Sequence, residues 1–333
     1  MRRDPSLPES PLAIPRIEIS GTPHNAETPP AALVQAITPQ GSHFLRSHFV
    51  IPQPSETSLL VDDTGIELSQ LIELGSRTFA VTLECAGNGR LGMMPLPTGE
   101  PWGDGAVSTA VWTGVQLRLL LERVGLRDDA VEILAEGADG FARSLPIEDA
   151  LDPDTLLAFE MNGRPLSAEH GAPLRLLVPG WYGMASVKWL ARLRTLTQPF
   201  AGFYQMERYV YDAQHPVSRM RVKSYVVRPR ADETVALGEV HAHGWAWSGF
   251  AEIERVDVSL DGGDSWQPAT VGRPLSPHSW CPWEIAFEID RPGRHTLRAR
   301  ATDATGHVQP CESQWNRLGY GVNAVALRCF SVL

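Results

Sequence analysis

The feature that most limits the fold of this chain is the regular alternation of apolar and polar residues in its last third. The segments 253–260, 283–289 and 295–303 place apolar residues at every second position, as strands with one buried face do. The sequence Asp261-Gly-Gly-Asp264 follows the first of these segments and is typical of a hairpin turn. Short strands separated by turns about every 8–12 residues predict an all-β, immunoglobulin-like sandwich over residues 216–333.

The chain before residue 216 mixes strand and helix patterns. Alternation over Arg77–Glu84 predicts a strand, which ends in a turn rich in Gly and Asn. After Thr113 the apolar residues take helical spacing as far as a stop at Gly125, so we expect a helix with Thr113 as its N-cap. Short apolar runs predict further strands at 131–135, 174–180 and 186–196. This mixture indicates an α+β domain.

Length and charge agree with two globular domains. The chain has 333 residues, and a domain usually takes roughly 100–200. We expect an extended, proline-rich arm at residues 1–25, an α+β domain at 26–215 and the sandwich at 216–333. The net charge of −10 excludes a broad basic surface, so neither nucleic acid nor a membrane is an expected partner. The sequence shows neither a signal-peptide pattern nor a long apolar span, which predicts a cytoplasmic protein.

Cys85 is the first candidate for chemistry, because it lies where a predicted strand meets a glycine-rich turn, five residues before Arg90. Nearby positive charge favours the thiolate, which is both a nucleophile and a soft metal ligand. A nucleophilic cysteine would need a histidine partner, for which His48 and His170 are candidates. A buried, inert thiol is the remaining interpretation.

Taken together and in order, several segments resemble the sulfite oxidase family of molybdenum cofactor enzymes. The segments that carry the resemblance are FLRSH (44–48), TLECAGNGR (82–90), GAVSTAVWTGV (105–115), MNGRPLSAEHGAPLRLLVPGWYGMASVKWL (161–190), GWAWSG (244–249), VDVSLDGGDSW (256–266) and WNRLGYGVNAV (315–325). They cover nearly the whole chain past about residue 25.

The resemblance implies a fold and a cofactor. It implies a molybdopterin-binding (sulfite oxidase-type) α+β domain, followed by an immunoglobulin-like domain through which family members usually form a homodimer. Cys85 matches the cysteine that ligates molybdenum. The residues matching those that hold the pterin and its phosphate are Phe44, Leu45, Arg46, Ser47, His48, Asp139, His170, Arg175, Ser186, Val187 and Lys188. Arginine and lysine suit a phosphate dianion.

The resemblance also implies catalytic residues. Tyr209 matches the family's active-site tyrosine, and Arg46 and Arg90 match arginines that line its anion pocket. The family has a third such arginine close to its C-terminus. Arg328, the last residue of NAVALR, is the candidate for this position.

Three positions depart from the family pattern. They are Ser47, Gly89 and Tyr204, where family members generally carry asparagine, arginine and tryptophan. These departures are expected to reshape the anion pocket while leaving the cofactor in place.

The activity implied is the oxidation of sulfite, or a related sulfur oxyanion, to sulfate by oxygen-atom transfer. Only about 40 residues precede the FLRSH segment, so we expect no haem domain there. Two electrons would then pass to a separate acceptor, such as a cytochrome. One alternative is the same cofactor acting as a reductase of nitrate, a sulfoxide or another oxo compound. An alternative of a different class is a non-catalytic binding protein on the same scaffold.

Overall fold

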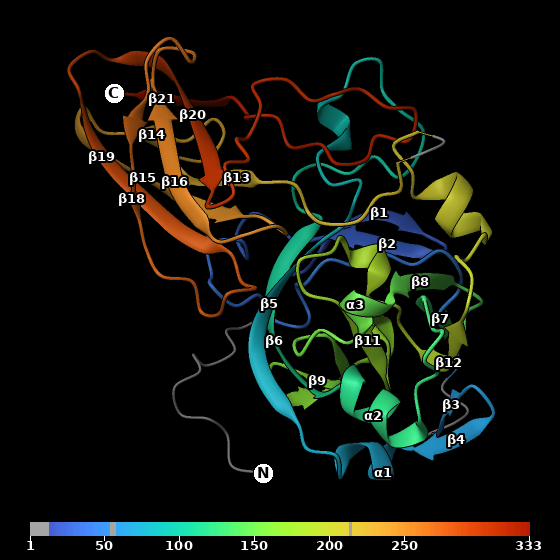
Figure 1. The fold of residues 1–333 in the computed structure, drawn as a ribbon. Coiled ribbons are helices and arrows are strands. Elements are labelled where there is room, and N and C mark those ends of the chain that lie inside the picture. The colour runs from blue at the N-terminus through green and yellow to red at the C-terminus, as the bar shows by residue number, and fades with distance from the viewer. Residues whose placement is uncertain (1–12, 54–57, 213–214) are drawn as a thin grey trace.

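The computed structural model describes residues 13–53, 58–212 and 215–333. Its elements form two groups (Figure 1). Strands β3 to β12 and the helices form one body, and β13 to β21 form a second body beside it. Most strand pairs are antiparallel, and the parallel pairs are β3 with β12 and β14 with β21.

Two sheets organise the first body. One has the order β10-β9-β6-β5, with β11 also paired to β9, and the other has the order β4-β3-β12-β7-β8. The strands of the first sheet are β5 (Arg77–Glu84), β6 (Val107–Gln116), β9 (Leu156–Met161), β10 (Arg164–Pro165) and β11 (Arg175–Leu177). Those of the second are β3 (Ser58–Val61), β4 (Thr64–Glu67), β7 (Glu132–Gly137), β8 (Ala142–Pro146) and β12 (Leu190–Leu196). Every residue of β6 is buried, so this strand lies at the centre of the domain.

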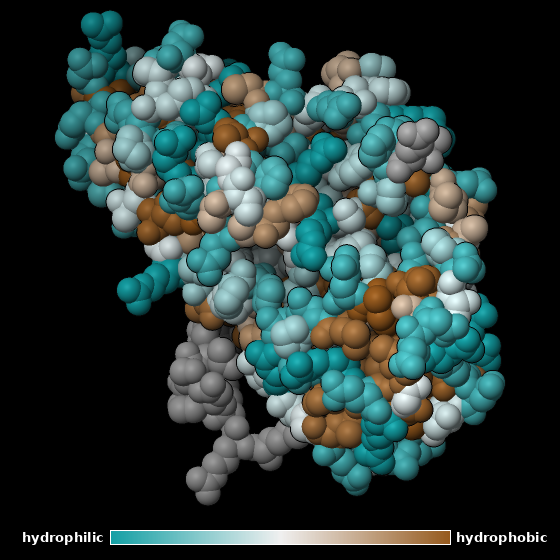
Figure 2. Space-filling model, in the orientation of Figure 1, coloured by the Kyte–Doolittle hydropathy of each residue, from teal (hydrophilic) through white to brown (hydrophobic). Residues whose placement is uncertain are grey.

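Helices in this body are short. They are α1 (Leu68–Ile72), α2 (Leu117–Val124) and α3 (Ile147–Ala150), with single turns at η1 (Arg90–Gly92), η2 (Ala168–His170), η3 (Gly183–Ala185) and η4 (Tyr204–Arg208). On the face shown in Figure 2, hydrophobic residues gather in the region of these helices. Partly buried side chains such as Leu126 and Ile147 pack onto the large core cluster. No helix of the described ranges is long and apolar enough to cross a bilayer.

The helix predicted from Thr113 is wrong at its N-terminal end. Thr113 belongs to β6, and its hydroxyl hydrogen-bonds that of Thr78 at 2.9 Å instead of capping a helix. Val115 pairs with Leu157 of β9, so long-range pairing extends the strand to the point where α2 begins. The predicted stop is confirmed, since Gly125 caps α2 with a φ of 85°.

The strand predicted over 186–196 begins later than expected. β12 covers only its second half, while Ser186 to Trp189 form a turn in which Trp189 has a φ of 50°. The carbonyl of Ser186 accepts a hydrogen bond from the Arg175 guanidinium at 3.0 Å, and the carbonyl of Val187 accepts one from the Leu176 amide at 2.8 Å. These bonds hold the segment against β11 before β12 begins.

The second body has the two sheets that the alternating sequence predicts. Their orders are β13-β15-β19-β18 and β14-β21-β20-β16-β17. The strands are β13 (Lys223–Arg228), β14 (Thr234–Val235), β15 (Gly238–Trp247), β16 (Ile253–Ser259), β17 (Gln267–Pro268), β18 (Thr270–Val271), β19 (Cys281–Ile289), β20 (Gly293–Asp303) and β21 (Arg328–Val332). Leu297, Ala299 and Ala301 share one fully buried face of β20, as period 2 requires. Both sheets contribute to one core, in agreement with the predicted sandwich.

The N-terminal arm, predicted to be extended, folds back on itself within its described part. β1 (Ile17–Gly21) and β2 (His24–Glu27) form an antiparallel hairpin; residues 1–12 lie outside the described residues. Ala26 then exchanges backbone hydrogen bonds with Leu45, at 3.1 and 2.8 Å. The hairpin is therefore fixed beside the FLRSH segment.

A candidate cofactor site

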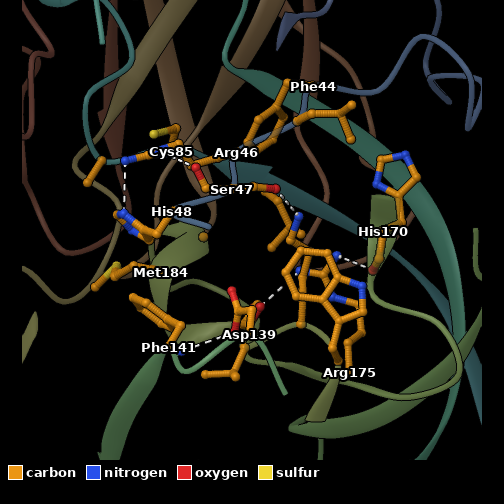
Figure 3. Close-up of a pocket in the computed structure, with 18 of the residues that line it drawn as sticks. Phe44, Arg46, Ser47, His48, Cys85, Asp139, Phe141, His170, Arg175 and Met184 are labelled. Carbon is orange, nitrogen blue, oxygen red and sulfur yellow. Dashed lines mark hydrogen bonds between the residues drawn. The ribbon is translucent and has the colours of Figure 1, made fainter. Parts of the chain in front are cut away.

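A cavity of about 730 Å³, its open mouth included, lies in the first domain (Figure 3). Its walls come from loops that follow β2, β5, β7 and β11 and from the segment after η4. The lining residues are His43, Phe44, Leu45, Arg46, Ser47, His48, Leu83, Cys85, Ala86, Asp139, Phe141, His170, Arg175, Gly183, Met184, Ser186, Val187, Lys188, Trp189 and Tyr209.

Cys85 is held at the end of β5 by backbone hydrogen bonds. Its amide donates to the carbonyl of Ala106 at 2.8 Å, and its carbonyl accepts from the amide of Asn88 at 2.9 Å. Burial raises the pKa of the Cys85 thiol, while the charges of Arg46 and Arg90 act against that rise. A buried thiol of this kind loses its proton readily only to a bound metal, because coordination replaces the proton.

The metal-ligating side chains at the cavity wall suit a metal whose other ligands come from a cofactor. Among residues 13–53, 58–212 and 215–333, no group of three or more His, Cys, Asp or Glu side chains gathers as a metal site. Cys85 therefore offers one soft ligand at the cavity wall. For a molybdenum cofactor that brings its own sulfur ligands, Cys85 would supply the thiolate from the protein.

Two cations, the partly buried Lys188 and the buried Arg175, line another part of the cavity. Lys188 Nζ donates to Ser47 Oγ at 3.0 Å and to the carbonyl of Glu169 at 2.9 Å. The Arg175 guanidinium donates to the carbonyls of His170 and Ser186, each at 3.0 Å.

These two cations lack an anionic partner at contact distance. Burial lowers the pKa of Lys188 well below its usual range and that of Arg175 to about 9. Neither makes an ion pair with a carboxylate of the described residues. Because a buried charge is costly without a partner, this wall favours a bound anion such as the phosphate of a pterin cofactor.

Three histidines of the cavity are kept neutral. Burial lowers the pKa of His43 to about 3, that of His48 to about 2 and that of His170 well below its usual range. His43 Nε2 is buried without a hydrogen-bond partner in the described structure. This orphaned polar atom in the wall is a further sign that a polar group fits here.

Tyr209 lies at the cavity wall with a defined hydrogen-bond direction. Its hydroxyl is 2.7 Å from His48 Nε2, and an Arg46 N–H donates to His48 Nδ1 at 3.0 Å. Because arginine only donates, the neutral imidazole must carry its proton on Nε2 and donate it to Tyr209. Burial raises the pKa of the Tyr209 phenol. Its own O–H is consequently present and free to donate to a group inside the cavity.

Arg46 and Arg90 are placed differently from one another. Arg46 lines the cavity and donates to Asn25 Oδ1 at 3.2 Å and to the carbonyl of Ser47. Arg90 is buried behind the lining, where its Nε donates to the carbonyl of Leu318 at 3.0 Å and its Nη1 donates to the carbonyl of Glu100 at 2.6 Å. Its charge still acts on Cys85. Arg90 therefore influences the cavity through its electrostatic field and does not form part of the cavity wall.

Arg328 does not reach the cavity. It begins β21, donates to the carbonyl of Val226 at 3.3 Å, and stacks on the Tyr225 ring at 5.6 Å. The register that would bring it into the anion pocket therefore does not hold for this structure.

Structural reasons for two of the departures are visible. Gly89 has a φ of 87°, which residues with a side chain rarely adopt, and a Cβ there would lie only 3.2 Å from Val322 Cγ1 and 3.3 Å from Lys223 Nζ. Ser47 accepts a hydrogen bond from Lys188.

The structure brings every predicted cofactor residue to one cavity, together with Cys85 and Tyr209. Their individual roles stay predictions. His43, Phe141 and Met184 also line the cavity, and sequence reasoning assigned none of them an individual role. His43 is the residue before the FLRSH segment, and Phe141 donates its amide to Asp139 Oδ1 at 3.0 Å. Burial raises the pKa of Asp139. Proximity to predicted residues was the available signal, although Met184 had no distinguishing pattern.

Comparisons with known proteins agree with this geometry. A family model for the oxidoreductase molybdopterin binding domain matches residues 55–204, and one for the Mo-co oxidoreductase dimerisation domain matches residues 214–326. Mitochondrial sulfite oxidase of Macaca fascicularis is 33% identical over 359 residues, covering 95% of this chain and 66% of that protein. An NADH nitrate reductase of Solanum lycopersicum is 32% identical over 353 residues, covering 89% of this chain and 39% of that protein. The chain thus spans between about two fifths and two thirds of these relatives' lengths.

Among solved structures, the sulfane dehydrogenase SoxCD from Paracoccus pantotrophus is similar over nearly the whole chain. The TM-score is 0.83 at 29% sequence identity, with 98% of this chain and 92% of that chain covered. The match includes both bodies of the fold, and so extends beyond either domain alone.

Proposed function

Because the chain belongs to the sulfite oxidase family of molybdopterin-dependent oxidoreductases, we propose that it oxidises sulfite, or a related sulfur oxyanion, by oxygen-atom transfer. For sulfite the balanced reaction takes sulfite and water to sulfate, two protons and two electrons. The electrons pass to a separate acceptor, such as a cytochrome. The observation that carries this proposal is the meeting of Cys85, Arg46 and Tyr209 at one cavity that also has a buried cationic wall.

Each part of the cavity has a role in this proposal. The molybdenum cofactor, when bound, supplies the oxygen-atom transfer and stores two electrons. Cys85 would ligate the metal as a thiolate, and Lys188 and Arg175 would hold the phosphate of the pterin. The neutral histidines leave these cations as the main positive charges of the wall.

Arg46 and Tyr209 would handle the substrate. Coulomb attraction between the Arg46 guanidinium and an anion about 4 Å away is worth about 4 kcal/mol at an effective dielectric constant of ~20, before desolvation. The hydrogen bond from His48 Nε2 turns the Tyr209 O–H away from the imidazole. Tyr209 can then donate to an oxygen of the substrate, orienting it for reaction.

A reductase of nitrate, a sulfoxide or another oxo compound is the second candidate. Two observations favour it: NADH nitrate reductases are about as similar to this chain as sulfite oxidases are, and the cavity has fewer cations than the family pattern predicts. Gly89 lacks a side chain, and Arg328 is turned elsewhere. Fewer cations weaken the preference for a divalent anion.

Steady-state turnover of the molybdenum-loaded protein tests the proposal. Sulfite, nitrate and a sulfoxide are offered in turn with artificial electron carriers, and the molybdenum content of each sample is measured. We expect sulfite to be the best substrate. Cys281→Ser is a matched control for Cys85→Ser, because Cys281 is also a buried free thiol but lies in the sandwich. A loaded protein that turns over nitrate and not sulfite would support the reductase, and one that turns over nothing would support a binding protein.

We also propose that the second domain forms a homodimer, as the matching dimerisation-domain model suggests. Light scattering of the purified protein tests this. A mass near twice 36.6 kDa is the expected result, and a mass near the monomer value would contradict it.

A further inference from the structure

A loop of the second domain, Asn316–Gly321, is braced by its own hydrogen bonds. The amide of Gly319 donates to the carbonyl of Asn316 at 3.0 Å. The Asn316 side chain accepts from the amide of Tyr320 at 3.0 Å and donates to its carbonyl at 2.8 Å. These bonds fix the backbone of the loop.

This loop forms one side of the slot that holds Arg90. The Leu318 carbonyl accepts from Arg90 Nε at 3.0 Å, and the guanidinium lies over the Tyr320 ring at 5.4 Å. A Cβ on Gly319 would lie 2.8 Å from Arg90 Nε, and one on Gly99 would lie 2.8 Å from Nη1. Gly99 of the first domain and Gly319 of the second therefore leave the space that the Arg90 side chain occupies.

The same loop touches the other reactive groups. The Gly321 amide donates to the carbonyl of Ala86, the residue after Cys85, at 2.8 Å. The Tyr320 ring stacks on the Tyr209 ring with a centroid separation of 5.2 Å and an angle of 21°. Tyr320 is itself buried, so its ring is fixed by the packing on both sides.

We propose that Tyr320 is a positioning residue through which the second domain fixes the active site of the first. Its ring supports the Arg90 guanidinium on one contact and the Tyr209 phenol on another, while the backbone of the same loop holds the turn that carries Cys85. The contribution of the second domain to the site is then this tyrosine and its loop, and not Arg328. The kinetic part of this inference rests on the proposed oxidation of a sulfur oxyanion.

Substitution of Tyr320 separates positioning from domain packing, because the bonds of Leu318 and Gly321 are made by backbone atoms and remain. Tyr320→Leu removes the ring, and Tyr320→Phe retains it. Tyr320→Met is the second ring-less variant if the leucine variant does not accumulate. Tyr225→Leu is the matched control, since Tyr225 also lies in the second domain under an arginine, Arg328, and is outside the cavity.

Three quantities are measured on each protein: molybdenum content, kcat and KM for sulfite, and hydrogen exchange of the amides in residues 85–92 without substrate. Stacking and cation–π contacts are each worth about a two- to tenfold factor. We expect Tyr320→Leu to lower kcat/KM about tenfold, chiefly through KM, and to speed exchange in residues 85–92. Molybdenum content should not change, because Tyr320 does not line the cavity. Tyr320→Phe should stay within about twofold of the wild type.

Two results would overturn the inference. One is unchanged kcat/KM and unchanged exchange in both ring-less variants. The other is an equal loss in Tyr225→Leu, which would show general weakening of the second domain. If the wild type does not oxidise sulfite at all, the proposed function fails, and the exchange comparison still decides whether Tyr320 positions the Cys85–Arg90 turn.

Discussion

Removal of the Lys223 charge should destabilise the protein in a way that depends on pH. Lys223 on β13 places Nζ 3.5 Å from Glu84 Oε1, and these side chains are 6% and 1% exposed. Glu84 also accepts from Asn88 Nδ2 and from Trp247 Nε1, each at 2.9 Å. This buried ion pair joins the second domain to the residue before Cys85.

The size of the effect follows from the burial of Glu84. Burial raises the pKa of Glu84, and Lys223 is the largest influence against that rise. In Lys223→Met, the buried carboxyl would take up a proton instead of staying charged and alone. Protonating a carboxyl of ordinary pKa 4.5 at pH 7 costs about 3.4 kcal/mol, since one pKa unit is about 1.4 kcal/mol. This cost is the expected upper loss of stability at pH 7.

The sign of the pH dependence is fixed by the same reasoning. A carboxyl whose pKa is higher in the folded than in the unfolded protein stabilises the folded state most at a pH below its unfolded-state pKa. This stabilisation is lost as the pH rises. The penalty of Lys223→Met should therefore shrink to about 1.4 kcal/mol at pH 5.5.

Urea unfolding of both proteins at the two pH values, followed by tryptophan fluorescence, measures the penalty. The double variant with Glu84→Gln serves as the control, and it should recover much of the loss at pH 7 because no charge stays unpaired. A penalty below about 0.5 kcal/mol at pH 7, or one that does not vary with pH, would refute the reasoning.

Three further substitutions test the site itself. Cys85→Ser should abolish turnover while leaving pterin largely bound, because the cationic wall is intact; full activity measured with sulfite would refute the ligand assignment. Arg46→Gln should raise KM for an anionic substrate by tenfold or more, as loss of a charge-assisted contact of about 1.5–3 kcal/mol requires, and an unchanged KM would place the anion elsewhere. Tyr209→Phe should lower kcat/KM by about tenfold or more through loss of one directed hydrogen bond, and equal rates in the two proteins would show that another group orients the substrate.

Much of the fold follows from sequence because its signals are local. The alternation that places Leu297, Ala299 and Ala301 on one face of β20 needs no knowledge of other strands. The error at Thr113 has the opposite origin. Helical spacing is present there, but pairing with β9, about forty residues away, extends β6 through Gln116. Such competition between local pattern and distant pairing cannot be resolved from the segment alone.

The same distinction between local motifs and distant contacts applies to the site. Cys85 and the FLRSH, HGAPLR and SVK segments are compact motifs, and the structure brings them to one cavity. Tyr320 lies in the WNRLGYGVNAV segment, but that segment gives it no individual role, because its importance arises from a contact with Tyr209 across more than one hundred residues of sequence. The position of Arg328 also depends on the register of β21. Contacts between domains are therefore where sequence reasoning is weakest.

The most direct test of the central claim is sulfate formation by molybdenum-loaded protein given sulfite and an artificial electron carrier. We predict one sulfate and two electrons for each sulfite consumed, in proportion to the molybdenum content, and none from Cys85→Ser. Fully loaded protein that forms no sulfate, or sulfate formation that is independent of molybdenum content, would contradict it.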